Sequence, residues 1–346
     1  MKNLFALLAL VLTLTGSFAA QAQTIHRVNN SGLPINGVNI YSTLQDAHDA
    51  ASAGDIIYLE PTDNSYGNLT CTKQLTIIGN GYFLDQNPTL KLDERDARVG
   101  TINLASGSDG SRITGCVVQG NFFVAVGDVT IERNHTNTIF LGYNSGFSVG
   151  GNNVIVRQNY ITSTVYLYSG STAATALSNV NITNNIILGS INAQSNSVQL
   201  NNVLIANNVV GNLAGTTAAG IRVENAVIKN NILTYTGTIS NFTPNNNSYS
   251  YNISGNSAFG TANGNQQNIA PTSLFVGGTA STDGAFQLSA GSPASGAGES
   301  GTDVGAFGGT TPYRIAGIPN VPSIYEYNQS VSGNSLNATI STRSNN

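Results

Sequence analysis

Glu132, Arg133, His135 and Arg157 carry the side chains that acid–base chemistry on a sugar would need. A basic side chain takes a proton beside a uronate carboxyl group, and a cation stabilises the anion that forms. In a lyase of this kind, Arg157 or Arg133 would act with Glu132 or His135. Simpler interpretations compete with this one, because Glu132 and Arg157 also fit an exposed cross-strand ion pair, and His135 fits a surface turn.

No complete catalytic set is visible in the sequence. A glycoside hydrolase needs two or three carboxylates close together, and a Ca²⁺-dependent lyase needs several around its metal. The aligned repeats place no two carboxylates in register on adjacent turns, and no three acids in one cluster. Cysteine and histidine do not show metal-binding spacing either. The sequence therefore indicates no cofactor and no metal, with Ca²⁺ entering only under the lyase interpretation.

Other side chains suggest binding without catalysis. Aromatic rings stack on sugar rings, and four tyrosines are predicted to point outward from the strands. They are Tyr143, Tyr160, Tyr166 and Tyr168. Arg222 and Glu224 alternate on one predicted strand face and are charged candidates for the same ligand. The competing interpretation is packing for some of the tyrosines and an exposed ion pair for Arg222 and Glu224.

A repeat in the middle of the chain must position these residues. Its pattern is Asn-Val-x-Ile-x-Asn-Asn followed by two apolar residues, as in residues 179–187 and 202–210. The last Asn recurs in steps of 25, 26, 23 and 23 residues, at Asn134, Asn159, Asn185, Asn208 and Asn231. A fixed period in this range is typical of a solenoid. Because apolar residues alternate with period two inside each copy, we expect three short strands per turn and a parallel β-helix.

The repeated asparagines are predicted to be structural. Asn tolerates the left-handed backbone of a sharp corner, and stacked amides hydrogen-bond from one turn to the next. A second Asn column contains Asn153, Asn179, Asn202 and Asn225. The position two residues before each final Asn varies, and it gives the column Glu132, Arg157, Thr183, Ala206 and Lys229. This alignment places Glu132 beside Arg157, one turn apart.

The ends of the chain differ from the repeats. Residues 1–22 combine an early lysine, an apolar run and an Ala-Gln-Ala cleavage site, so we expect a signal peptide and an extracytoplasmic protein. The location would be the periplasm, the cell surface or the extracellular medium. Residues 23–310 are predicted to form the β-helix, and residues 311–346 a linker followed by a hairpin-like strand pair.

A short helix is predicted ahead of the repeats. Ser42 and Gln45 fit a capping box, and Leu44, Ala47, His48 and Ala51 share one helical face. An amphipathic helix at this place would cover the open end of a solenoid, which otherwise exposes apolar side chains and unpaired backbone.

Composition limits the partners. Charged residues make up 9% of the chain, against about 25% in typical domains, and the net charge is −4 without a basic stripe. Nucleic acid is therefore not an expected partner. No second apolar run is long enough to span a membrane. Cys71 and Cys116 would pair if their turns stack, or would be two small buried side chains.

Three segments resemble a known family. A helix with an Ala-x-x-Ala face precedes Gly54–Leu59 and Leu75–Gly79, the Asn columns follow, and Leu288–Ala294 and Asp303–Phe307 close the region. Across residues 40–310 the chain resembles right-handed parallel β-helix proteins of the pectate-lyase-like superfamily, of the secreted bacterial type. The resemblance implies the fold but no single activity, because that superfamily includes lyases, hydrolases, phage spikes and adhesins.

We therefore expect a secreted β-helix protein that binds a polysaccharide or another cell-surface component and has no evident catalytic centre. A carbohydrate-active enzyme, lyase-like in mechanism, is the first alternative. A structural or adhesive surface protein is the second, and in it the C-terminal strand pair would mediate attachment.

Overall fold

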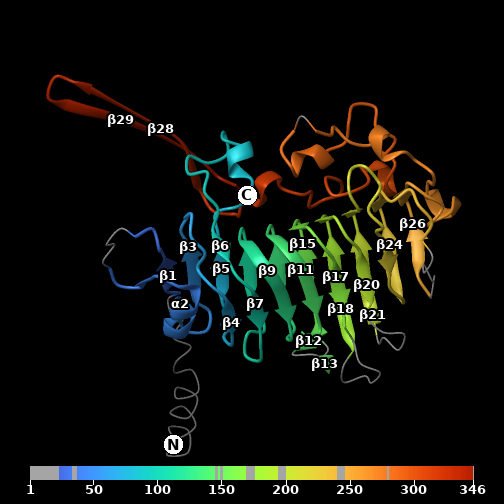
Figure 1. Ribbon diagram of the computed structural model, residues 1–346, viewed down its shortest axis with the longest axis horizontal. Helices are drawn as coiled ribbons and strands as arrows, with labels where there is room; N and C mark the ends of the chain where they lie inside the picture. The colour runs from blue at the N-terminus through green and yellow to red at the C-terminus, as the bar shows by residue number, and fades with distance from the viewer. Residues whose placement is uncertain are drawn as a thin grey trace, which may run out of the picture.

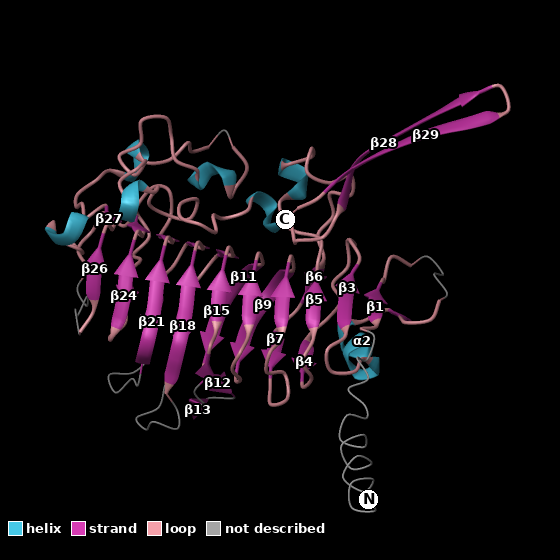
Figure 2. Ribbon diagram, turned by 180° about the vertical axis from the view of Figure 1, so that it is seen from behind, coloured by secondary structure: helices cyan, strands magenta, loops and turns pink. Residues whose placement is uncertain are grey.

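The computed structural model describes residues 23–32, 37–144, 147–148, 151–168, 176–193, 200–239, 246–278 and 280–345. Over these residues the chain folds as a parallel β-helix, which confirms the predicted fold class. Most strands pair in parallel with their counterparts one turn away, and the rungs stack along one axis (Figure 1, Figure 2). The predicted signal peptide, residues 1–22, lies outside the described residues.

Face A is the sheet that precedes the repeated Asn in each turn. Its pairing follows the predicted column, because Glu132 pairs with Arg157, Arg157 with Thr183 and Ala206 with Lys229. Along the axis the strands are β2 (Ile40–Tyr41), β1 (Ile25–Val28), β3 (Ile56–Leu59), β5 (Thr76–Ile78), β8 (Arg112–Thr114), β10 (Thr130–Glu132), β15 (Ile155–Arg157), β18 (Leu177–Thr183), β21 (Leu200–Ala206), β24 (Ala226–Lys229) and β26 (Ser248–Ser250), with β14 (Gly151–Asn152) beside β18.

Face B is the row of strands that follows the repeated Asn. It contains β6 (Arg98–Val99), the first halves of β9 (Val117–Val124) and β11 (His135–Leu141), β16 (Tyr160–Ile161), β19 (Ile186–Ile187), β22 (Val209–Val210), β25 (Ile232–Leu233) and β27 (Ile253–Ser254).

Face C follows face B in each turn. It contains β4 (Leu69–Cys71), β7 (Ile102–Leu104), the second halves of β9 and β11, β17 (Val165–Leu167), β20 (Ile191–Ala193) and β23 (Ile221–Arg222). The pairing of β9 with β11 shifts register between Thr136 and Thr138, where the chain passes from face B to face C. A short hairpin, β12 (Tyr143–Asn144) and β13 (Phe147–Ser148), follows β11.

The repeated asparagines form a buried ladder, as predicted. Asn185 donates from Nδ2 to Asn208 Oδ1 at 3.0 Å and to two backbone carbonyls, and its own Oδ1 accepts from Asn159. The ladder continues beyond the five predicted positions through Asn252 and Asn265. Each lost amide would leave buried partners without hydrogen bonds, at a cost of about 1–3 kcal/mol per group.

The left-handed corner lies one residue before the ladder. A column of residues with positive φ contains Arg133, Gln158, Asn184, Asn207 and Asn230, which we call the corner column. In the second predicted Asn column, the same residue has the left-handed backbone and makes the side-chain hydrogen bond between turns. Asn179 has φ 55° and donates to Asn153 Oδ1 at 3.0 Å on the exposed side of the coil.

Helix α2 (Leu44–Ala50) packs at the N-terminal end against β1 to β4. The predicted apolar face is buried, including Leu44 and Ala47. The cap differs from the prediction by one residue, because Thr43 Oγ1 accepts the Asp46 amide hydrogen at 3.1 Å. Thr43 has extended backbone angles, so its hydroxyl faces the unpaired amides of the first turn. None of the helices in the described ranges is long and apolar enough to cross a bilayer.

Residues 268–278 and 280–321 run back over the outside of face B, and we call them the return segment (Figure 1). This segment contains the 3₁₀ turns η4 (Pro271–Ser273), η5 (Gly284–Phe286), η6 (Glu299–Gly301) and η7 (Ile315–Gly317); η1 (Leu84–Gln86) and η3 (Ala262–Gly264) lie outside it. The expected closing turns and the expected linker after residue 310 are both parts of this packed segment. The predicted boundary at 310 falls inside it because Tyr313, Ala316 and Ile318 are buried.

The predicted strand pair at the C-terminus is present. β28 (Ser323–Ser332) and β29 (Ser335–Arg343) form an antiparallel hairpin that extends away from the solenoid (Figure 1, Figure 2). Cys71 and Cys116 are both free and buried, so they do not form a disulfide here. Burial raises the pKa of the Cys116 thiol to about 12.

Candidate functional site

The alignment correctly places Glu132 beside Arg157 and misses a third residue. Glu132 lies between two arginines on face A: Arg157 Nε donates to Oε2 at 2.6 Å, and Arg112 Nε donates to Oε1 at 2.8 Å. Burial alone would raise the pKa of Glu132, but the two guanidinium groups outweigh it and hold the pKa below its usual range. An ionised, doubly paired carboxylate is a poor proton acceptor at neutral pH.

The other two catalytic candidates lie elsewhere. Arg133 belongs to the corner column and is 5% exposed, and it donates to Gln158 Oε1 at 2.8 Å and to the Ile318 carbonyl at 2.9 Å. It therefore holds the return segment and has no open surface for a substrate. The sequence shows a charged side chain at Arg133, but it does not reveal that its partner is the distant Ile318 carbonyl.

His135 packs among aromatic rings on the outside of face B. Its ring lies 4.9 Å from that of Phe83, 5.7 Å from that of Tyr82 and 5.4 Å from that of Tyr160. Burial lowers its pKa to about 4, so the imidazole is neutral at pH 7. The structure therefore brings together Glu132 and Arg157, but not Arg133 or His135 with them.

Face C carries an outward column of aromatic residues. Register pairs Phe123 with Phe140 and Phe140 with Tyr166. The rings of Phe123 and Phe140 are stacked at 4.9 Å with an interplanar angle of 9°, and those of Phe140 and Tyr166 at 5.3 Å with 11°. All three are partly exposed. Consecutive rungs of a parallel sheet bring identical positions close enough for this contact.

Two further tyrosines pack beside this column. Tyr143 lies 5.6 Å and Tyr168 6.0 Å from Phe140, and the two tyrosine rings lie 4.6 Å apart. Both are partly exposed. We call these five residues, Phe123, Phe140, Tyr143, Tyr166 and Tyr168, the aromatic ladder. Three of the four predicted tyrosines belong to it.

Tyr160, the fourth predicted tyrosine, is a correction. It points out of the coil as expected, but from face B, where the return segment covers it to 4% exposure. Its ring contacts Phe83 and Phe286, and burial raises its pKa to about 12. Tyr160 is therefore a packing residue. A side chain that points out of the coil is exposed only where no later segment of the chain covers it.

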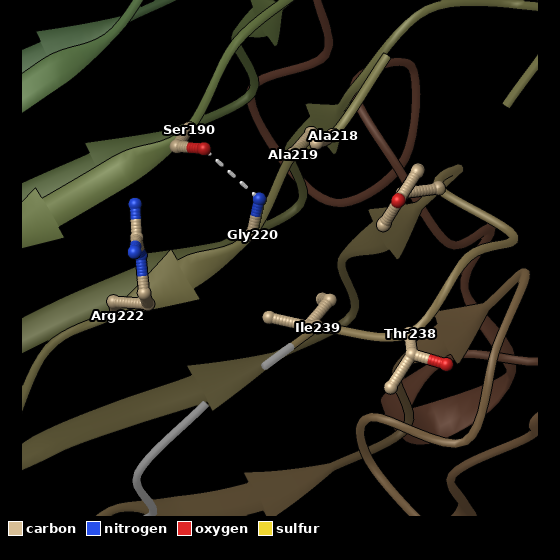
Figure 3. Close-up of a pocket in the computed structure, with 8 residues that line it drawn as sticks. Ser190, Ala218, Ala219, Gly220, Arg222, Thr238 and Ile239 are labelled. Carbon is tan, nitrogen blue, oxygen red and sulfur yellow. Dashed lines mark hydrogen bonds between the residues drawn. The ribbon is translucent and has the colours of Figure 1, made fainter. Parts of the chain in front are cut away.

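Arg222 continues the column of the aromatic ladder. Tyr166 pairs with Asn192, and Asn192 with Arg222, whose Nε donates to Asn192 Oδ1 at 3.0 Å. Figure 3 shows Arg222 beside Ser190 and Gly220 at a small cavity of about 130 Å³. Glu224 lies two residues along and is partly exposed, and among the described residues no ion pair joins it to Arg222.

The sequence reasoning missed Phe123, Phe140 and Arg112. Phe140 stands six residues after the ladder residue Asn134, and Tyr166 seven after Asn159. Because the two offsets differ by one residue, continuing the alignment without a gap sets Phe140 beside Val165, and only the strand pairing shows that Phe140 and Tyr166 share one outward column. Arg112 was hidden because its strand precedes the regular repeats.

Metal sites and relatives add no further candidates. In the part of the chain that the structure covers, no three His, Cys, Asp or Glu side chains gather as metal ligands. No family model, no curated protein and no solved structure matches this chain. The family resemblance therefore rests on the sequence motifs, and the coarser part of it, a parallel β-helix solenoid, is what the structure shows.

Proposed function

We propose that this protein binds a polysaccharide through the aromatic ladder of face C and does not cleave it. The observation that carries the proposal is the cluster itself: five rings on the outside of the coil, each partly exposed and each in contact with at least two of the others. Water makes few favourable contacts with exposed aromatic carbon, whereas the apolar C–H face of a sugar ring packs well on it.

The surroundings of the ladder supply hydrogen-bonding groups. Asn137 and Thr162 are exposed beside it, with Asn121 on the adjoining rung. Arg222 is exposed and extends the same outward column past Tyr166, with the buried Asn192 between them. An aromatic centre with amide, hydroxyl and guanidinium groups at its margin fits a ligand with apolar ring faces and many hydroxyl groups. Neighbouring rungs repeat the contact along the axis, which suits a polymer.

The paired state of Glu132 supports binding over catalysis. Its carboxylate is held by two arginines, and the remaining catalytic candidates point to other surfaces. A signal peptide, predicted for residues 1–22, also fits the proposal, because export would bring the ladder to extracellular or cell-wall polysaccharides.

The test is a glycan array probed with the full chain, followed by calorimetric titration of each glycan that binds. Tyr166→Ala and Phe140→Ala are expected to weaken binding at least tenfold, because each removes a ring on which the ligand stacks. Tyr160→Phe is the matched control, since it changes a covered tyrosine and is expected to leave the affinity unchanged.

Two results would overturn the proposal. One is an affinity that Tyr166→Ala and Phe140→Ala leave at the wild-type value. The other is turnover: uronate polysaccharides incubated with and without Ca²⁺ would develop the absorbance of unsaturated products, and Arg157→Ala would abolish it. The second result would establish the lyase interpretation in place of binding.

A further inference from the structure

The C-terminal hairpin is amphipathic, although it stands away from the solenoid. One of its faces is mostly apolar and contains Ile324, Tyr327, Val331, Leu336, Ala338 and Ile340, together with the uncharged polar residues Gln329 and Thr342. Cross-strand pairing joins Tyr327 to Ile340 and Val331 to Leu336, and Ala338 connects the two pairs along β29, opposite Gln329. We call this face the apolar hairpin face. The opposite face is polar and contains Glu326, Asn328, Ser330, Asn337, Thr339 and Ser341.

The apolar hairpin face is uncovered in the single chain. Val331 is 75% exposed, Leu336 65% and Ile340 56%. With Tyr327 and Ile324, these side chains leave roughly 500 Å² of apolar surface in water, a size at which a patch marks an interaction site. A ribbon with water on both sides would not need its apolar side chains gathered on one face. A two-stranded hairpin is also marginally stable unless one face is covered.

The base of the hairpin is fixed to the body. Leu92 donates its amide hydrogen to the Ile324 carbonyl at 2.9 Å, and Asn345 Nδ2 donates to the Val321 carbonyl at 2.7 Å. The return segment leads directly into β28 and is itself packed. The hairpin therefore leaves the body from an anchored base, away from the sheets of its own solenoid (Figure 1, Figure 2).

We propose that the apolar hairpin face pairs with the same face of a second copy of this chain. The face carries no charged side chain, so two copies meet without like-charge repulsion. Two faces of this size bury about 1,000 Å² together, which reaches the lower range of specific interfaces. The two ribbons pack as sheets about 10 Å apart, with both polar faces outward.

A second copy fits these observations better than a lipid surface does. Adsorption to anionic lipid depends on basic residues beside the apolar ones. The only cation of the two strands is Arg343, and its guanidinium lies 4.4 Å from the centre of the Tyr325 ring. Pairing of two copies would also place two aromatic ladders in one particle, which raises the avidity for a polymer without any new contact.

Sedimentation equilibrium of the full chain tests the pairing. The wild type is expected to reach the mass of two chains as its concentration rises. Val331→Lys with Leu336→Lys places two charges in the apolar hairpin face and is expected to reduce the mass to one chain over the same range. Ser330→Lys with Asn337→Lys is the matched control, since it adds the same charge to the neighbouring rung on the polar face and is expected to stay dimeric.

Disulfide trapping gives an independent readout that does not weaken the hairpin. Ala338→Cys lies at the middle of the apolar hairpin face and is expected to give a covalent dimer on oxidation, whereas Thr339→Cys on the polar face is expected to give none. Cys71 and Cys116 are buried and do not interfere. A wild type that stays monomeric overturns the proposal, as does a dimer that survives the two lysines. Sedimentation of the wild-type monomer with neutral phosphatidylcholine vesicles would overturn it in favour of a lipid surface.

Discussion

Faces B and C each have a column of outward side chains, and strand β11 contributes one side chain to each. The two columns lie in different environments. Strand β11 begins on face B with His135 and ends on face C with Phe140, and both side chains point away from the interior. The return segment covers the first column and leaves the second partly exposed. The inner residues of both faces are buried and mostly aliphatic, so the difference between the two columns lies outside the coil.

The covered column explains why face B needs the return segment. Its outward residues are mostly aliphatic: Val117, Ile186, Val209, Ile232 and Ile253, with His135 and Tyr160. The return segment contributes Phe275, Phe286 and Val304 to a second hydrophobic core above them. Apolar burial is worth about 25 cal/mol per Å², so a column of this length stabilises the docked segment strongly.

The corner column holds the cover in register. Gln158 Nε2 donates to the Pro312 carbonyl at 2.7 Å, Asn184 Nδ2 to the Gly308 carbonyl at 2.8 Å, and Asn230 Oδ1 accepts from the Glu299 amide at 3.0 Å. These amides satisfy an irregular backbone that would otherwise be buried without partners. Face C has no comparable row of amides bonded to a covering segment among the described residues. An outward column therefore stays open to a ligand where no neighbouring row of amides binds a later segment over it.

Tyr160 and Tyr166 are the same residue type in the two columns, but Tyr160 is covered and Tyr166 is partly exposed. Tyr160→Ala is expected to lower the free energy of unfolding by about 3–5 kcal/mol, since it leaves a cavity among Phe83, His135 and Phe286. Urea denaturation measures it. A loss below 1 kcal/mol would mean that the return segment contributes little to the stability of face B.

His135 makes the covered column sensitive to acid. Burial lowers its pKa from 6.5 to about 4, so between these values the unfolded chain binds the proton more tightly than the folded one. The contribution of the neutral His135 ring to the free energy of unfolding is fully present above pH 6.5. It is lost as the pH falls toward 4, by up to about 3 kcal/mol. His135→Phe is expected to keep the packing and to flatten this part of the pH profile of stability. An unchanged profile in that variant would place the imidazole in water.

Asn184 tests the attachment of the return segment without touching the apolar core. Asn184→Gly keeps the left-handed backbone, φ 56°, but removes the bonds to Ala306 and Gly308. The expected loss is about 1–3 kcal/mol, with faster hydrogen exchange in residues 299–311. Asn179→Gly is the matched control, because Asn179 has the same backbone angle but is exposed. Equal losses in the two variants would show that the glycine itself, and not the lost amide, is responsible.

The solenoid could be predicted from sequence because its rules are local and repeated. In every copy an apolar residue such as Ile182 precedes the final Asn, such as Asn185, by three residues, although the corner residue between them varies. Aligning the copies predicts the column from Glu132 to Lys229, and the strand pairing confirms it. The capping helix and the C-terminal strand pair carry equally local signals.

The return segment could not be predicted in the same way, because its partners are far away in sequence. Tyr82 OH lies 2.5 Å from Tyr313 OH, although 231 residues separate them. Tyr160 and Tyr166 look alike in sequence, and only the path of residues 268–321 decides which is exposed. The sequence therefore predicted only part of the candidate site. It indicated three of the tyrosines, whereas the fold shows that they group with Phe123 and Phe140.

Tyr166 completes the comparison with the smallest effect on stability. Tyr166→Ala removes one ring from the end of a stack that is partly in water, so the expected loss is about 1 kcal/mol, a fraction of that for Tyr160→Ala. Tyr166→Phe keeps the stack and is expected to be neutral in urea denaturation. If Tyr166→Ala were as costly as Tyr160→Ala, the aromatic ladder would be a second packed core and not an open surface. A small loss of stability together with a large loss of glycan affinity is the combination that only a binding surface gives.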